Sequence, residues 1–175
     1  MEKYPQPYIE YLVHFHGSRD YFECHEIMEE FWIENNHDVK WLALIQIAVA
    51  VYHERQKNID GGLRLYRKVL SHLRNDRGLL NDLSIHQSDL EQLIKSRIKN
   101  MLYEGPYQPL DLPIIDEALI EQCKQLAAKR GWEWSSCEIE DTTELIYRHK
   151  LRDRSEVIQA RQHSLIKKKK EREEG

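Results

Sequence analysis

The chain has 175 residues, of which 26 are basic and 30 acidic, and a formal charge of −4. Hydrophobic residues at 41% and charged residues at 32% are typical of a polar globular protein that can bury one core. The sequence contains no apolar run near the roughly 20 residues of a membrane span, no signal-peptide core and no cysteine spacing for disulfides or zinc. We therefore expect a reduced, cytoplasmic protein without a membrane segment.

Helical periodicity dominates the first third of the chain. The spacing of apolar residues predicts a short helix over 8–16, a second helix over 21–34 and a third over 38–58. A capping box from Asp20 to Glu23 opens the second helix. The middle of the third helix is apolar on almost every side, so we expect it to be the buried central helix.

Three further helices follow in the middle of the chain. We predict one over 61–75 with Asp60 as its cap, and one over 88–104 opened by a capping box at Ser88. Proline and glycine positions predict the last one over 113–131. The sequence therefore indicates an all-α protein, a compact antiparallel bundle of about six helices with a charged C-terminal helical tail.

The charge divides the chain into two parts. Residues 1–147 carry −9 and residues 148–175 carry +5. We assign 1–135 to the bundle domain and 136–175 to a linker and a charged, partly frayed helix. The basic residues of this tail include Arg148, Lys150, Arg152, Lys167, Lys168, Lys169 and Lys170. A solvated helix or docking on an acidic protein surface is expected, and nucleic acid is not, because the tail offers almost no aromatic side chain for base stacking.

The most informative stretch is the second predicted helix. On a helical wheel, His25 and Glu29 fall in the middle of the apolar stripe, and Glu26 falls at its border. A carboxylate on a core face is costly unless it is paired. A His–Glu pair one turn apart satisfies itself in part, and burial would shift both pKa values, so we place the candidate site here.

The third predicted helix offers a facing polar stripe. Its members are Leu42, Gln46, Val49 and His53. If the two helices form a hairpin, Gln46 lies within reach of His25, and His53 lies about two turns farther along. The pattern therefore predicts a buried polar network of His25, Glu29, Trp32, Gln46 and His53.

These residues resemble a known family. The stretches 21–32, 44–50 with His53, and 58–62 are similar to a prokaryotic family catalogued as domain of unknown function 309, whose pattern is His-Glu-x-x-Glu-x-x-Trp after Tyr or Phe, an apolar helix and an Asn-x-x-Gly-Ala turn. The resemblance covers roughly 4–130. It implies a small all-α bundle with no established activity and a shared site around His25, Glu26, Glu29, Trp32, Gln46 and His53.

Three hypotheses about function remain open. In the first, the protein is an interaction module for a protein partner or a second copy, and the polar network fixes its helix geometry. In the second it is an enzyme, with His25 as general base, Glu29 orienting it and Glu26 as a second acid–base group. In the third, His25 and Glu29 bind a metal with Glu26 or His53, but no matching motif occurs on the next helix, so we expect no metal or cofactor.

Overall fold

The computed structural model describes residues 3–135 of the chain. The basic residues from Arg148 to Lys170, and the linker and helix predicted over 136–175, lie outside this range. The described part contains six α-helices, a π-helical turn and a short 3-10 helix. They are α1 (Gln6–Val13), η1 (His14–Ser18, the π turn), α2 (Tyr21–Glu34), α3 (Val39–Arg55), α4 (Ile59–Asn75), η2 (Asn81–Leu83, the 3-10 helix), α5 (Gln87–Leu102) and α6 (Glu117–Lys129).

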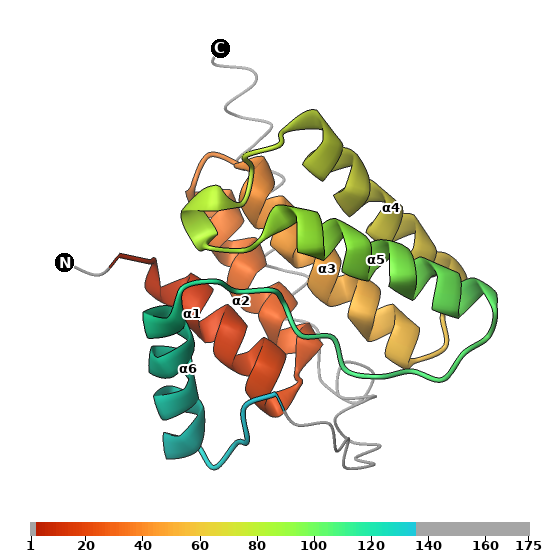
Figure 1. Ribbon diagram of the computed structural model, residues 1–175. Helices are drawn as coiled ribbons and strands as arrows, with labels where there is room; N and C mark the ends of the chain where they lie inside the picture. The colour runs from red at the N-terminus through yellow and green to blue at the C-terminus, as the bar shows by residue number, and fades with distance from the viewer. Residues whose placement is uncertain (1–2, 136–175) are drawn as a thin grey trace, which may run out of the picture. The chain divides into compact units, whose positions relative to one another are not determined.

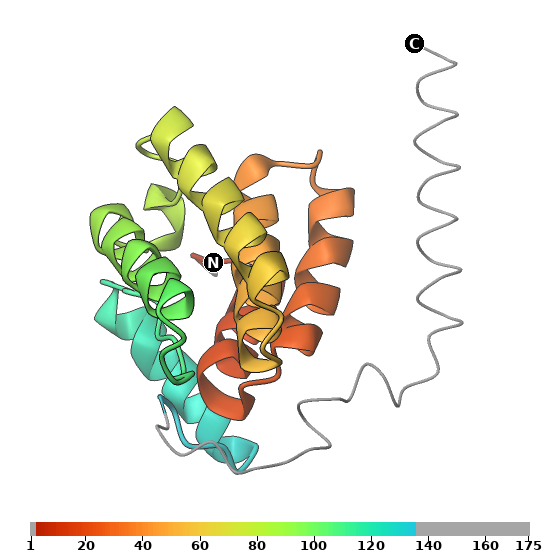
Figure 2. The same ribbon diagram turned by 90° about the vertical axis from the view of Figure 1, so that its right-hand side faces the viewer.

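The helices form a bundle around α3 (Figure 1). Its most extensive contacts are with α2 and α4, α5 packs on α4, and α1 contacts both α2 and α6. Figure 2 shows α5, α4, α3 and α2 in succession across this bundle. Among residues 3–135 there is no strand, only an isolated bridge between Ile85 and Ile114, which confirms the predicted all-α class. No helix of this part of the chain is long and apolar enough to cross a membrane.

The α2–α3 hairpin forms as the sequence predicted. Asp20 caps α2, because its carboxylate accepts a hydrogen bond from the Glu23 amide at 3.1 Å. Asn36 and His37 adopt left-handed backbone conformations in the turn, with φ of 61° and 56°. Asp38 then caps α3 through the amide of Lys40. Two adjacent capped helices with a short turn therefore lie antiparallel.

The caps of α4 and α5 correct two predictions. Asn58, rather than Asp60, caps α4, since its side-chain oxygen accepts a hydrogen bond from the Gly61 amide at 3.3 Å. His86, rather than Ser88, caps α5 through the amide of Asp89 at 3.2 Å. In both cases a side-chain acceptor two residues earlier in the chain took the cap position.

The predicted start of the last helix is wrong. Residues 103–116 form an extended connector, and α6 begins only after Asp116, whose carboxylate accepts hydrogen bonds from the amides of Ala118 and Leu119. The connector pairs with the chain before α5, because the His86 amide donates to the Pro113 carbonyl at 2.8 Å. These bonds hold Pro113 in an extended segment instead of a first helical turn.

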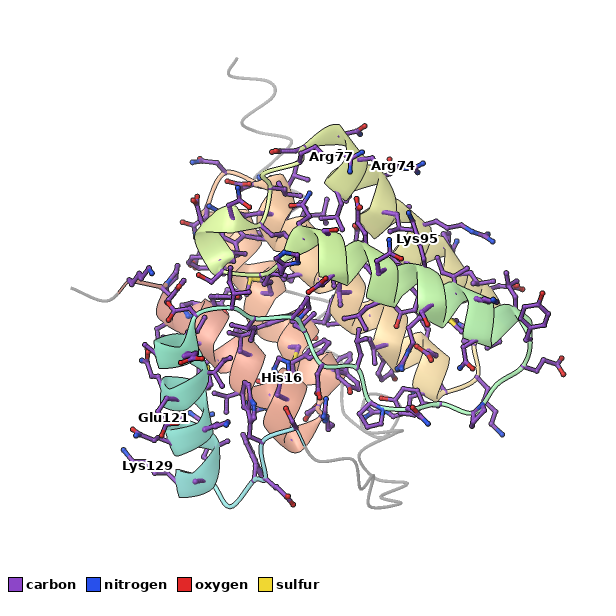
Figure 3. The ribbon with its side chains drawn as sticks, viewed as in Figure 1. His16, Arg74, Arg77, Lys95, Glu121 and Lys129 are labelled. Atoms are coloured by element: carbon purple, nitrogen blue, oxygen red, sulfur yellow. The ribbon has the colours of Figure 1, made fainter. Side chains whose placement is uncertain are left out.

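His16 joins the π turn to the connector. This side chain is fully buried, and Figure 3 places it inside the described bundle. Its Nδ1–H donates to the Leu12 carbonyl at 3.0 Å, which leaves Nε2 to accept a hydrogen bond from the Leu112 amide at 3.0 Å. Trp134 stacks on the His16 ring at 4.4 Å. The neutral imidazole therefore provides a hydrogen-bond partner for both the Leu12 carbonyl and the Leu112 amide. Burial lowers the pKa of His16 to about 4.

Replacing Asn58 by alanine tests the corrected cap of α4. We expect Asn58→Ala to lower the free energy of unfolding by about 1 kcal/mol, because the Gly61 amide loses its acceptor. Asp60→Ala is the matched control and should cost less than half as much, since Asp60 makes no capping bond and acts only through the helix dipole. Urea denaturation measures both values, and an equal or larger loss for Asp60→Ala contradicts the assignment.

His16 predicts a pH dependence of stability. Because its pKa is about 4 in the folded protein and about 6.5 in the unfolded chain, stability is complete above pH 6.5 and is lost as the pH falls toward 4. The loss should reach about 3 kcal/mol near pH 4. Urea denaturation at pH 7 and pH 4.5 should show a clearly smaller difference for His16→Gln than for the unmodified protein. His14→Gln is the comparison. Burial also lowers the pKa of His14, but this side chain is only half-buried, so its substitution should reduce the difference between the two pH values less than His16→Gln does. An equal difference for the His16 variant and the unmodified protein would refute the assignment.

Candidate functional site

The candidate site is a half-buried face shared by α2 and α3, here called the α2–α3 face. Its residues are His25, Glu26, Glu29, Trp32, Leu42, Gln46, Val49 and His53. They lie neither in the core nor fully in solvent. The helical wheel placed His25 and Glu29 in the middle of the apolar stripe. In the structure these side chains lie at the border of the buried stripe instead.

His25 and Glu29 form the i,i+4 pair that the spacing predicted. Nε2 of His25 lies 2.7 Å from Oε2 of Glu29. The side chains are 13% and 26% exposed, so water reaches the pair. An i,i+4 pair of this kind on a partly exposed helix stabilises it only modestly.

Glu26 lies on the other side of the same imidazole. Its Oε1 is 3.8 Å from Nδ1 of His25, which is too long for a hydrogen bond. Both atoms are buried, and neither has a hydrogen-bond partner. His25 is therefore held by Glu29 at one nitrogen and has an unsatisfied nitrogen next to a second carboxylate.

The α3 side of the face is the one stripe of that helix that is not fully covered. Leu42, Gln46, Val49 and His53 are all partly exposed, whereas eleven of the seventeen residues of α3 are buried. Oε1 of Gln46 is buried and makes no hydrogen bond. Since Nδ1 of His25 is also without a partner, these two atoms do not form the predicted His25–Gln46 bond.

His53 belongs to a second, separate group. Its Nδ1 lies 3.1 Å from the side-chain nitrogen of Asn58, and partial burial together with the nearby Arg64 lowers its pKa. The rings of Phe22 and Tyr52 lie between this group and His25, with successive centroid distances of 5.8, 6.2 and 5.8 Å. The predicted network is thus two polar pairs joined by aromatic rings.

Trp32 completes the α2 end of the face. Its ring meets that of His37 edge-on at a centroid distance of 4.6 Å. Phe31 on the neighbouring side of α2 packs edge-on against Trp41 of α3 at 4.9 Å. These aromatic contacts fix the hairpin end of the two helices and leave the indole of Trp32 partly exposed.

Cys24 follows Glu23 on α2 but belongs to the core and not to the α2–α3 face. Burial raises the pKa of the Cys24 thiol well above its ordinary value, and its sulfur donates to the Tyr11 carbonyl at 3.4 Å. Cys24 is therefore a core residue without thiolate character. Within residues 3–135 no group of three or more His, Cys, Asp or Glu side chains is placed to hold a metal ion.

The two helices on either side of α3 carry opposite charges. α2 contains five glutamates and no lysine or arginine. α4 contains four basic residues and one acidic residue. Figure 3 shows Arg74 of α4 and Lys95 of α5 on the same part of the bundle. The α2 half of the α2–α3 face therefore belongs to an acidic helix.

The sequence analysis overlooked a buried charged cluster at the end of α3. Glu54 and Arg55 are 4% and 8% exposed. Oε1 of Glu54 accepts hydrogen bonds from the Tyr66 hydroxyl at 2.8 Å and from Arg97 at 3.0 Å. Burial raises the pKa of Glu54, and the positive charge of Arg97 opposes this shift. The available signal was that Arg55 falls opposite the Gln46 stripe, on the most buried side of α3.

A double-mutant cycle measures the strength of the His25–Glu29 pair. We expect His25→Ala and Glu29→Ala to show a coupling of about 0.5 kcal/mol in the free energy of unfolding, because the pair is partly hydrated. The more exposed Lys40–Asp82 pair, at 3.7 Å, serves as the control and should give a smaller coupling. A coupling above about 2 kcal/mol would instead indicate a sealed, strongly desolvated pair.

Comparison with known proteins identifies the family. The profile of a domain of unknown function, DUF309, matches residues 8–65, a range that contains the whole α2–α3 face. The chain is 38% identical over 173 residues to the uncharacterized protein YpuF of Bacillus subtilis (strain 168), which covers 97% of this chain and 99% of that relative. No solved structure matches the chain. The chain therefore belongs to the domain of unknown function 309 family, as the motif around His25 indicated.

Proposed function

We propose that the protein is an interaction module whose α2–α3 face binds a basic, amphipathic helix of a partner protein. The observation that carries this proposal is an incompletely covered stripe of α3 that carries aliphatic side chains, next to the Glu26 and Glu29 carboxylates of α2. A helix laid along such a surface buries apolar side chains and places its cations near the carboxylates. The cytoplasmic location expected from the sequence belongs to the same proposal.

Apolar contact would supply most of the affinity. Leu42 and Val49 of α3 and Trp32 of α2 are each partly exposed at neighbouring positions. Val39, at the start of α3, is 42% exposed and extends the same stripe. Partly exposed indole and aliphatic groups at helical spacing are typical anchor points for a docked helix.

Charge and unsatisfied polar atoms would supply the specificity. Oε1 of Glu26 and Oε1 of Gln46 are acceptors without a hydrogen-bond partner. A lysine or arginine on the docked helix would pair with the Glu26 carboxylate, since that side chain is 25% exposed. The lack of any lysine or arginine on α2 favours a cationic partner over an anionic one.

Acid–base catalysis is the weaker alternative. Nδ1 of His25 is buried, and Nε2 is engaged by Glu29. A general base needs a ring nitrogen within hydrogen-bond reach of a substrate. The geometry of His25 therefore supports a positioning role for this side chain within an interaction surface.

A model peptide tests the proposal. The probe is a peptide of about 18 residues made of leucine and lysine in the 3.6-residue helical pattern, with a fluorescent label. We expect saturable binding to the full chain by fluorescence anisotropy. The double variant Glu26→Lys/Val49→Lys should weaken binding at least tenfold, because it removes one carboxylate and places charge on the apolar stripe.

Three controls make the result specific. Glu121→Lys reverses an exposed charge on α6, away from the face, and should leave binding unchanged (Figure 3). A peptide of the same composition in scrambled order, and a leucine–glutamate counterpart, should bind weakly or not at all. Equal binding of all three peptides, or an equal loss in Glu121→Lys, would contradict the proposal.

A further inference from the structure

Arg55 is a buried cation at the last turn of α3. Its side chain is only 8% exposed, and its guanidinium carbon lies 4.7 Å from the centre of the Tyr21 ring. Nη1 donates to the carbonyl of Arg19 at 2.7 Å. The guanidinium is therefore fixed between the end of α3 and the start of α2.

The other two nitrogens of Arg55 are unsatisfied. Nε and Nη2 are both buried, and neither has a hydrogen-bond partner. The N–H groups of these two atoms point in the same direction from one edge of the guanidinium. That edge is the fork with which arginine binds two oxygens of one carboxylate or phosphate group.

Neighbouring arginines have anionic partners, and Arg55 does not. Arg19 pairs with Asp111 at 2.8 Å, and Arg97 pairs with Glu54 at 3.0 Å. In the described part of the chain no carboxylate lies within salt-bridge distance of Arg55. Burying a cation without a paired counter-charge is unfavourable, so an anion bound at this edge would stabilise the fold.

The surroundings of Arg55 suit a small anion. The hydroxyl of Tyr107, in the connector, donates to the hydroxyl of Tyr21 at 3.1 Å. Arg55 is close enough to Tyr107 for its charge to oppose the rise in the pKa of Tyr107 that burial causes. The N-terminal end of α2 adds a positive helix dipole nearby, although the Asp20 carboxylate already caps it.

The connector passes close to this region. Arg97 donates to the carbonyl of Gln108, and Arg19 donates to the carbonyl of Leu110 at 2.9 Å. Two arginine side chains thus hold the connector near the ends of α2 and α3. Through Tyr107, the connector also lies near Arg55 itself.

We propose that Arg55 is the centre of a binding site for a small oxyanion, a carboxylate or phosphate group held by Nε and Nη2. Arg55 lies on the side of α3 opposite Gln46, so this site is separate from the α2–α3 face. The oxyanion supplies the counter-charge and accepts both unsatisfied hydrogen bonds. Phosphate and acetate, tested separately, distinguish a phosphate-bearing ligand from a carboxylate.

The test is the thermal stability of the full chain in sodium phosphate and in sodium acetate, each against sodium chloride of equal ionic strength. We expect a saturable rise in melting temperature with at least one of the two oxyanions. A rise with phosphate alone indicates a phosphate-bearing ligand, and a rise with acetate alone indicates a carboxylate. Arg55→Lys keeps the charge but loses the fork, and should weaken the response at least tenfold.

Arg74→Lys makes the same substitution at an exposed arginine of α4 and should leave the response unchanged (Figure 3). If Arg55→Lys does not fold, the nuclear magnetic resonance signal of the Arg55 Nε–H group in the unmodified chain replaces it. That signal should shift saturably with the active oxyanion. No saturable response to either anion, or an equal response in Arg55→Lys, overturns the proposal.

Discussion

Burial of α3 is the constraint on which the rest of the structure depends. Eleven of its seventeen residues are buried, so it must be surrounded on nearly every side. α2 and α4 provide the closest cover. Gly62 lets α4 approach, since a β-carbon there would lie 3.4 Å from the Ala50 carbonyl oxygen and 2.7 Å from Met101. The stripe from Leu42 to His53 is what this arrangement leaves partly open.

The same burial explains the charged cluster at the end of α3. The helix continues into the core through its last turn, which brings Glu54 and Arg55 out of water. Arg97 of α5 and the Tyr66 hydroxyl neutralise and satisfy Glu54. Arginine side chains also hold the connector by its carbonyl groups. Arg97, paired with Glu54, and Arg19 thus hold the connector between α5 and α6 in place.

The helices and the contact between His25 and Glu29 could be predicted because they depend on local patterns. Periodicity gave the extent of α2, and the spacing of His25 and Glu29 predicted their contact. The extended connector could not be found, because His86 and Arg19, distant in sequence, hold it by backbone carbonyls. That His25 and Gln46 lie at the same level without a hydrogen bond between Nδ1 and Oε1 could not be predicted, for a related reason. The relative register of two helices in a hairpin can be estimated from the sequence. The side-chain rotamers that decide whether two atoms form a hydrogen bond cannot be estimated in this way.

The central claim is that the α2–α3 face is a docking surface for a basic helix. Its most direct test is the map of amide chemical-shift changes when the full chain is titrated with the leucine–lysine peptide. The account predicts saturable changes concentrated in α2 and α3, around Glu26, Trp32 and Val49. Changes spread evenly over all six described helices, or confined to α5 and α6, would contradict it.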